Sequence, residues 1–298
     1  MRILVTGKSG QLVSSLREAA GARPDLELIT AGRPELDLAR PSSVRAKILA
    51  LKPDLVVNAA AYTAVDRAED EPARAHAINT NGARAVAEAA GSIGVPIIQI
   101  STDYVFSGDK QDEYQERDPT GPNTIYGLTK RDGEEAVTAS NSRHLILRTA
   151  WVYSPFGQNF VRTMLRLAQT RDTIRVVADQ WGNPTSALDL ADAILALALR
   201  LGEGPFGIFH LAGLGTTNWA GFARQIFAES RQNGGPFAAV EDIGTADFPA
   251  KAPRPTNSRL SSRHIAAEFG IEARPWQESV ARVVSRILRE GGSSGIAA

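Results

Sequence analysis

The first 150 residues alternate short apolar runs with longer helix-like segments. The runs rich in Val, Ile and Leu lie at residues 2–6, 26–30, 55–58, 97–101 and 145–149. Stretches rich in Ala, Glu and Arg separate them, notably residues 11–20 and 73–93. Strands that are apolar throughout and separated by helices are typical of a parallel sheet buried on both faces. The pattern therefore predicts an α/β fold with a doubly wound, Rossmann-like parallel sheet.

A glycine-containing turn follows the first apolar run directly. Gly7 and Gly10 lie three residues apart, between the predicted strand and the predicted helix. Glycines here allow a tight turn and let backbone N–H groups approach a pyrophosphate at the helix N-terminus. The alternative is an ordinary strand-to-helix turn, but the place after the first strand favours a phosphate site. Where many such loops carry a third glycine this chain has Val13, so we expect a slightly wider helix–strand separation.

The end of the second predicted strand bears on which dinucleotide binds. This strand ends near Thr30, and Arg33 follows shortly after it. A site for NADH usually places a carboxylate here, whereas an arginine can pair with a 2′-phosphate. We therefore expect NADPH as the cofactor, with NADH as an alternative, and we expect Asp37 to approach the adenine. The competing interpretation is that Arg33 is a solvated surface charge.

Three side chains near the fourth strand predict proton-transfer chemistry. Thr102 ends that strand, and Tyr126 and Lys130 follow four residues apart, which places them on one face of a helix. A nearby ammonium lowers the pKa of a phenol, and a phenol so tuned can donate a proton to a carbonyl. The Thr102 hydroxyl can hydrogen-bond the same carbonyl oxygen. A Tyr-x-x-x-Lys pair alone is common by chance, but its place after the glycine loop and four strands favours catalysis.

The alternation loosens after residue 150. Helix-like segments are expected at residues 159–170, 187–201, 219–230 and 276–289, with short apolar runs at 174–177 and 208–211. We predict a dinucleotide-binding domain at residues 1–150 that carries the catalytic residues. A smaller domain at residues 151–298 is expected to bind mainly the substrate, with segments that return to the first domain. The Gly/Ser/Ala-rich tail, residues 291–298, is expected to fray.

Composition excludes several classes of site. The 298 residues include no cysteine, which rules out disulfides, thiolate catalysis and cysteine-ligated metals. Lys plus Arg equals Asp plus Glu at 33 each, so charge favours neither nucleic acid nor an anionic membrane as a partner. The apolar start is too short for a signal peptide and no stretch could span a bilayer, which predicts a cytoplasmic protein. No metal site is expected from four scattered histidines: His76, His144, His210 and His264.

Eight segments resemble one family along nearly the whole chain. They are GKSGQL from Gly7, VNAAAYTAVD from Val57, STDYVF from Ser101, YGLTK from Tyr126, RTAWVY from Arg148, DQWGNPT from Asp179, HLAG from His210 and RPTNSRL from Arg254. Many enzymes share the first and the fourth, whereas the others in this order are far more specific. The chain resembles the extended short-chain dehydrogenase/reductases and, within them, the dTDP-4-dehydrorhamnose reductases.

The resemblance implies roles at the matching positions. It makes Tyr126 the proton donor, Lys130 its activator and a ligand of the nicotinamide ribose, and Thr102 the hydroxyl partner. The implied contacts of the pyrophosphate are Gly10, Gln11 and Leu12. Those implied beside the cofactor at the third strand's end are Ala60, Ala61 and Tyr62. The residues implied at the sugar are Thr102, Asp103 and Trp151, and on the nucleotide-diphosphate side Asn159 and Arg259.

The reaction implied by the resemblance is a carbonyl reduction on a nucleotide sugar. NADPH reduces the C4 ketone of dTDP-6-deoxy-L-lyxo-4-hexulose to give dTDP-L-rhamnose, while the protein supplies orientation and the proton. Some members of the family form dimers that bind a divalent metal through helix glutamates. The corresponding position of the first helix is Ser15, which argues against metal-linked dimerisation and leaves a homodimer as an open alternative.

Two other functions are compatible with the same motifs. One is reduction or epimerisation of another nucleotide-linked 4-keto-6-deoxy sugar, because the cofactor loop and the proton donor would be shared. The other is a non-catalytic regulatory subunit that binds cofactor and a partner protein. Intact Tyr126, Lys130 and Thr102 argue against the second, since a scaffold has no need of a proton donor.

Overall fold

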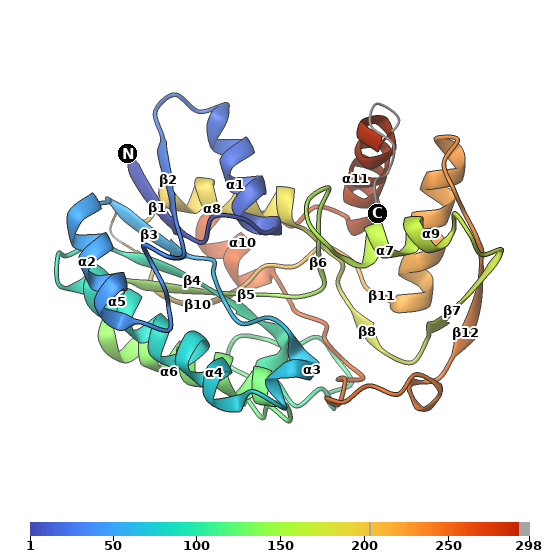
Figure 1. Ribbon diagram of the computed structural model, residues 1–298, viewed down its shortest axis with the longest axis horizontal. Coiled ribbons are helices and arrows are strands. Elements are labelled where there is room, and N and C mark those ends of the chain that lie inside the picture. The colour runs from blue at the N-terminus through green and yellow to red at the C-terminus, as the bar shows by residue number, and fades with distance from the viewer. Residues whose placement is uncertain (203, 292–298) are drawn as a thin grey trace.

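A six-stranded parallel sheet organises the larger lobe of the molecule (Figure 1). The computed structural model describes residues 1–202 and 204–291. The strand order is β10-β5-β4-β3-β1-β2, and every neighbouring pair is parallel. The strands are β1 (Arg2–Thr6), β2 (Glu27–Ala31), β3 (Leu55–Asn58), β4 (Ile97–Thr102), β5 (His144–Thr149) and β10 (Gly207–His210). This confirms the predicted doubly wound parallel sheet.

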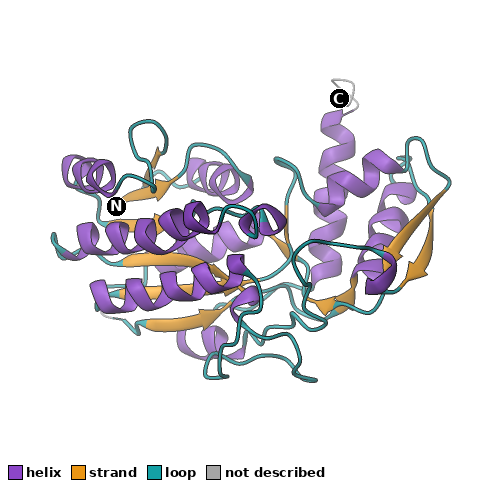
Figure 2. Cartoon of the chain, turned by 60° about the horizontal axis from the view of Figure 1, so that its bottom comes forward, coloured by secondary structure: helices purple, strands orange, loops and turns teal. Residues whose placement is uncertain are grey.

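Helices cover both faces of this sheet, because its strands are apolar on both sides. One face packs against α1 (Gln11–Gly21), α8 (Ala187–Ala198) and α10 (Arg263–Phe269). The other packs against α2 (Pro41–Leu51), α5 (Ala83–Gly91) and α6 (Ile125–Ser140). Figures 1 and 2 show the sheet between these two helical layers. The strand order reverses between β1 and β3, and ligands of such sheets bind beyond the carboxyl ends of the strands at that reversal.

The helix predicted at residues 73–93 is interrupted by a π-helical segment. It consists of α4 (Pro72–His76), the π-helix η1 (Ala77–Gly82) and α5. The π-helix brings polar side chains to α6, where Asn79 Nδ2 donates to Thr129 Oγ1 at 3.1 Å. Close packing accompanies it, since a Cβ on Gly82 would lie 2.7 Å from the Leu38 Cβ. Apolar periodicity does not reveal such a bulge, whereas tertiary hydrogen bonds stabilise it.

The smaller lobe is built from the second half of the chain. It contains α7 (Phe160–Leu167), α9 (Trp219–Gln232) and α11 (Trp276–Gly291), which enclose an apolar core of their own. The strands β7 (Thr173–Val177) and β12 (Ala239–Ile243) form a parallel pair on its outer side (Figure 1). We did not predict β12, because its sequence AVEDI is mostly exposed and lacks an apolar run.

Short elements connect the lobes. The smaller strands pair as β6 (Val152–Tyr153) with β9 (Thr185–Ser186) and β8 (Trp181–Gly182) with β11 (Thr217–Asn218). The single-turn helices are α3 (Val65–Ala68), η2 (Asp103–Val105) and η3 (Thr245–Asp247). Two ion pairs join the α3 region to the loop around residues 251–254. Arg254 contacts Asp66 of α3 at 2.6 Å, and Lys251 contacts Asp70, which follows α3.

The second half of the chain also contributes to the larger lobe. Strand β10 lies at the edge of the sheet beside β5, and α8 packs along α1. The assignment of cofactor and substrate binding to separate domains stays a prediction. Fraying is predicted for residues 291–298, of which Gly291 ends α11 and the others lie outside the described residues. Across residues 1–202 and 204–291, no helix combines the length and the apolar character needed to cross a membrane.

A buried ion pair lies beneath the carboxyl edge of the sheet. Arg148 of β5 contacts Glu134 of α6 at 2.7 Å, and their side chains are 3% and 4% exposed. Ser101 of β4 donates a further hydrogen bond to Glu134 at 2.5 Å. The guanidinium also lies over the Phe106 ring, 4.9 Å from its centre. The charges are thus paired and hydrogen-bonded, which a buried ion pair requires.

Removing one partner of this pair should strongly destabilise the protein. Arg148→Met leaves the Glu134 carboxylate buried and uncompensated, so the free energy of unfolding should fall by about 3–5 kcal/mol. Urea unfolding followed by circular dichroism measures the change. The matched control is Arg224→Met, which breaks a half-exposed pair with Asp242 and should cost less than about 1 kcal/mol. Equal effects of the two substitutions would contradict the prediction.

Candidate active site

The three residues predicted to be catalytic converge at the carboxyl edge of the sheet. Thr102 ends β4, and Tyr126 and Lys130 lie in the first two turns of α6. The Thr102 hydroxyl lies near enough to the Tyr126 phenol to lower its pKa, and it donates to Asp103 Oδ1 at 2.9 Å. A ligand carbonyl at this point would meet two hydroxyl groups on adjacent elements.

Local packing explains how Tyr126 reaches Thr102. The Thr124 hydroxyl caps α6 by accepting from the Gly127 N–H at 3.0 Å. A Cβ on Gly127 would overlap the Tyr104 carbonyl oxygen, so glycine lets the helix start directly against the loop after β4. The rings of Tyr104 and Tyr126 then meet edge to face, 5.5 Å apart. The glycine of the YGLTK segment therefore has a steric function.

The phenol of Tyr126 stays protonated at neutral pH. The pKa of Tyr126 is raised to about 12, chiefly by burial and also by the nearby Asp103 carboxylate, while the neighbouring Thr102 hydroxyl opposes the shift. We expected Lys130 to lower this pKa, and burial instead dominates. A phenol in this state can donate a proton but does not accept one at neutral pH.

Lys130 is held by the strand beside it. Its Nζ donates to the Ile100 carbonyl oxygen at 2.7 Å, and its side chain is buried. Burial lowers the pKa of Lys130 to about 8, and Glu134 one turn further along α6 opposes that shift. Below that pH the Lys130 amine is protonated, and its positive charge lies one helical turn from Tyr126.

Asp103 has hydrogen-bonding capacity that the protein leaves unused. Its side chain is 5% exposed, and burial raises its pKa to about 6. Oδ1 accepts from Thr102, whereas Oδ2 makes no hydrogen bond to the described residues, although the Ser258 hydroxyl lies near enough to lower the pKa of the carboxyl. Buried polar atoms are rarely left unpaired, so this oxygen is suited to accept from a ligand hydroxyl.

The glycine turn after β1 can take a phosphate. Gly7 and Gly10 have φ values of 106° and 113°, which side chains rarely adopt. No side chain caps the N-terminus of α1, and a Cβ on Gly10 would meet nothing within 4 Å. The N–H groups of this helix start are therefore open to an anion. Val13 is buried against the turn, where a Cβ on Gly7 would lie 3.2 Å from it, and the Leu12 side chain packs against the adjoining core.

A buried polar chain joins the phosphate turn to the Lys130 region, and sequence reasoning missed it. The Thr6 hydroxyl donates to Asn58 Oδ1 at 2.6 Å and accepts from the Ala60 N–H at 3.0 Å. Asn58 in turn donates to Gln99 Oε1 at 2.7 Å, and Gln99 donates to the Ile100 carbonyl at 2.9 Å. The same carbonyl accepts from Lys130. Polar residues inside apolar strands were the available signal.

Asn79 positions the segment after β3 and was also missed. Its side-chain amide accepts from the Tyr62 N–H at 2.8 Å and donates to the Tyr62 carbonyl at 3.1 Å. The Tyr62 phenol donates to Glu71 at 3.1 Å. Ala60, Ala61 and Tyr62 thus form a fixed backbone segment at the strand reversal. An asparagine within an Ala-rich helix was the sequence signal.

The residues predicted to read the adenosine part differ in their availability. Arg33 is exposed just after β2 and has no hydrogen-bond or ion-pair partner in the described part of the chain. Asp37 is already engaged, since its carboxylate accepts from the Ala39 N–H at 3.1 Å and from Arg40 at 3.3 Å. Lys8 of the glycine turn contacts Glu35 at 2.5 Å. Arg33 is therefore an open cation on this side of the candidate site.

Trp151 is held in a strained conformation at the start of the smaller lobe. Its φ of 48° is unusual for a residue with a side chain. Its indole stacks on that of Trp219 with ring centres 3.6 Å apart and planes within 8°. A Cβ on Gly182 would overlap the indole, so glycine is required there. Strain that packing over-determines in this way is frequent at ligand sites.

Asn159 and Arg259 are bound into the protein itself. Asn159 caps α7 by accepting from Arg162 and donates to the Ser154 carbonyl at 2.9 Å. Arg259 donates to Asn257 at 2.8 Å and to the Gln111 carbonyl. Their roles toward a nucleotide diphosphate stay predictions.

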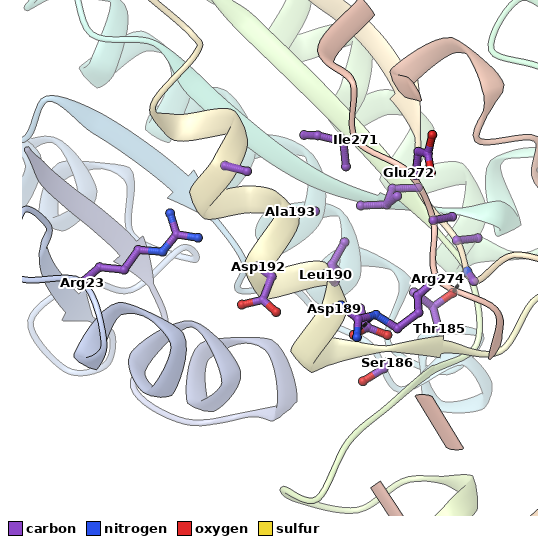
Figure 3. Close-up of a pocket in the computed structure, with 15 residues that line it drawn as sticks. Arg23, Thr185, Ser186, Asp189, Leu190, Asp192, Ala193, Ile271, Glu272 and Arg274 are labelled. Atoms are coloured by element: carbon purple, nitrogen blue, oxygen red, sulfur yellow. Dashed lines mark hydrogen bonds and ion pairs between the residues drawn. The ribbon is translucent and has the colours of Figure 1, made fainter. Parts of the chain in front are cut away.

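A separate cavity of about 430 Å³ lies along α8. Figure 3 shows Asp189 beside Arg274 at one end and Asp192 facing the side of Arg23. Asp189 and Arg274 are 3.4 Å apart. None of Thr102, Tyr126 and Lys130 lines this cavity, so its volume does not mark the site of the chemistry.

Comparison with known proteins agrees with this geometry. A family model described as "RmlD substrate binding domain" matches residues 1–289. The dTDP-4-dehydrorhamnose reductase of Sinorhizobium fredii is 49% identical over 295 residues, which are 98% of this chain and 99% of that protein. The chain belongs to the dTDP-4-dehydrorhamnose reductase family.

Solved structures extend the agreement to three dimensions. A dTDP-4-dehydrorhamnose reductase of Clostridium acetobutylicum superimposes with a TM-score of 0.91 at 36% identity, over 97% of this chain and all of that one. The enzyme of Bacillus anthracis, solved in complex with NADP, gives a TM-score of 0.88 at 35% identity and covers 95% of this chain and 98% of that one. The family resemblance inferred from the motifs is thereby confirmed.

The close packing of Trp151 against Gly182 can be tested by adding a methyl group at residue 182. Gly182→Ala places a methyl group where the indole lies, so the Trp151–Trp219 stack should open and stability should fall by about 1–3 kcal/mol. Stacked indoles couple their transitions, and the loss should appear in the circular dichroism of the tryptophan bands. Gly21→Ala is the control, because its Cβ would meet nothing within 4 Å. An unchanged tryptophan signal in Gly182→Ala would contradict this account.

Proposed function

We propose that the protein reduces the C4 ketone of dTDP-6-deoxy-L-lyxo-4-hexulose to dTDP-L-rhamnose, with NADPH as the reductant. It is an NAD(P)H-dependent oxidoreductase of the dTDP-4-dehydrorhamnose reductase family. The observation that carries the proposal is the meeting of Thr102, Tyr126 and the Lys130 turn of α6 at one edge of the sheet.

The residues present fit the cofactor. The open N-terminus of α1 offers backbone N–H groups to the pyrophosphate, and Arg33 offers a free cation to the 2′-phosphate. Lys130 would hold the nicotinamide ribose, and the Ala60–Ala61–Tyr62 segment would flank the dinucleotide. When bound, NADPH supplies the hydride that reduces the carbonyl carbon.

The protein's own contribution is orientation and a proton. Tyr126 donates to the C4 carbonyl oxygen and gives it the proton as negative charge develops there, and the Thr102 hydroxyl turns from Asp103 to donate to the same oxygen. The pKa of about 12 keeps Tyr126 loaded with that proton before the reaction. Lys130, charged below about pH 8, offsets the charge left on the phenolate. Asp103 Oδ2 accepts from a sugar hydroxyl, and Trp151 packs against the sugar.

The direct experiment follows NADPH absorbance with enzymatically generated dTDP-6-deoxy-L-lyxo-4-hexulose. Oxidation that depends on the sugar, with dTDP-L-rhamnose as the product, supports the proposal. Oxidation to a different product would indicate another 4-keto sugar. Tight NADPH binding without oxidation would favour the regulatory alternative.

Substitution of the proton donor tests the mechanism. Tyr126→Phe keeps the ring and removes the proton, so kcat should fall by about 10²–10⁴-fold with little change in NADPH binding. The control is Tyr153→Phe, which removes a phenol buried in the core of the smaller lobe, where its hydroxyl donates to the Trp276 carbonyl at 3.4 Å. Turnover of Tyr126→Phe within a few-fold of the parent would exclude Tyr126 as the donor.

Substitution of Arg33 tests cofactor choice. Arg33→Ala removes a charged partner of the 2′-phosphate, so the KM for NADPH should rise about tenfold or more while that for NADH changes little. Arg45→Ala, on the exposed face of the next helix, should leave both constants unchanged. Equal effects of Arg33→Ala on the two cofactors would show that Arg33 does not bind the phosphate.

Three expectations stay predictions. They are a cytoplasmic location, a homodimer and the absence of a metal site. Ser15, the residue at the position of the family's metal-binding glutamate, is buried and donates to the Gln11 carbonyl at 2.9 Å. Cell fractionation, analytical ultracentrifugation and metal analysis of the purified protein address them in turn.

A further inference from the structure

The side chain of Gln11 connects the cofactor turn to the smaller lobe. Gln11 is the first residue of α1, directly after Gly10. Its Oε1 accepts from the Ser154 hydroxyl at 2.9 Å, and its Nε2 donates to the Val152 carbonyl at 3.2 Å. These partners lie more than 140 residues away in sequence. Both ends of the amide are therefore engaged across the boundary between the lobes.

The backbone of the same residue lies where a pyrophosphate would bind. No side chain caps the start of α1, so its first N–H groups remain free for an anion. A pyrophosphate on these groups fixes the backbone of Gln11. Since the side chain is bonded at both ends to Val152 and Ser154, fixing one part of the residue restrains the other.

The segment that Gln11 holds leads to the proposed substrate contacts. Trp151 directly precedes Val152 in the chain, and Asn159 donates to the Ser154 carbonyl at 2.9 Å. Ser154 is fully buried and accepts from the Phe156 N–H at 3.1 Å, and its one hydroxyl hydrogen is shared between Gln11 Oε1 and the Phe156 carbonyl, both at 2.9 Å. The position of this segment therefore sets where Trp151 and the start of α7 lie relative to the cofactor turn.

We infer that Gln11 is a positioning residue that couples the binding of NADPH to the binding of the nucleotide sugar. The inference rests on the proposed function, and it concerns the side chain of Gln11 rather than its backbone. Each ligand orders one side of the Gln11 contact, so the second ligand binds to a site that is already ordered. Coupling of this kind must be reciprocal between the two ligands.

The test uses NADPH with dTDP-L-rhamnose, a pair that cannot react because both are already reduced. Calorimetry gives the Kd of NADPH without and with saturating dTDP-L-rhamnose. It then gives the Kd of dTDP-L-rhamnose without and with saturating NADPH. For each ligand, the coupling is the ratio of its Kd without the other ligand to its Kd with it. In the parent protein the two ratios should agree and should be about fivefold or more. In Gln11→Met, which keeps the side-chain length and loses both hydrogen bonds, the ratio should fall to nearly one.

Two further variants separate this contact from general contact between the lobes. Glu18→Gln weakens another bridge from α1 to the smaller lobe, the ion pair with Arg286 at 2.5 Å, and should keep the coupling. Ser154→Ala removes one of the two Gln11 bonds and should lower the coupling by a smaller factor. If Gln11→Met does not fold, Ser154→Ala provides the test in its place.

Each outcome decides the question. Coupling lost in Gln11→Met and kept in Glu18→Gln supports the inference. Independent binding in the parent, coupling retained in Gln11→Met, or equal loss in Glu18→Gln would overturn it. If the parent binds NADPH but not dTDP-L-rhamnose, the proposed function fails and the inference fails with it.

Discussion

Parallel pairing of β1, β3, β4 and β5 is the constraint on which the site depends. Because these strands all point the same way, their carboxyl ends meet at one edge and deliver Gly7, Ala60, Thr102 and Trp151 to neighbouring positions. Burial of the strands on both faces stabilises this arrangement. The polar chain through Thr6, Asn58 and Gln99 is tolerated inside the sheet since each group is hydrogen-bonded.

Burial also determines the chemistry of the proposed catalytic groups. The same desolvation raises the pKa of Tyr126 and lowers that of Lys130, which moves the two values apart. A protonated phenol near a lysine that is charged at neutral pH is suited to the direction of reduction. The Glu134–Arg148 pair beneath them keeps charge in the interior balanced and holds α6 against β5.

The smaller lobe acts through a few connecting contacts. Trp151 takes a strained backbone conformation so that its indole can fill the slot between Gly182 and Trp219. Gln11 links this segment to the cofactor turn, as Arg254 links the later loop to Asp66. In the proposed complex, the relative position of cofactor and sugar therefore depends on side chains that touch neither of the reacting atoms.

Local sequence determined the strands, the phosphate turn and the Tyr126–Lys130 spacing, because apolar runs, glycines and helical periodicity act over a few residues. The boundaries of β1 and β3 follow directly from their apolar runs. Only the tertiary structure decided the π-helix that aims Asn79 at Tyr62, the direction of the pKa shift of Tyr126 and the reach of Gln11 to Ser154. Each of these depends on burial or on hydrogen bonds between segments far apart in the chain, and no local pattern encodes such contacts.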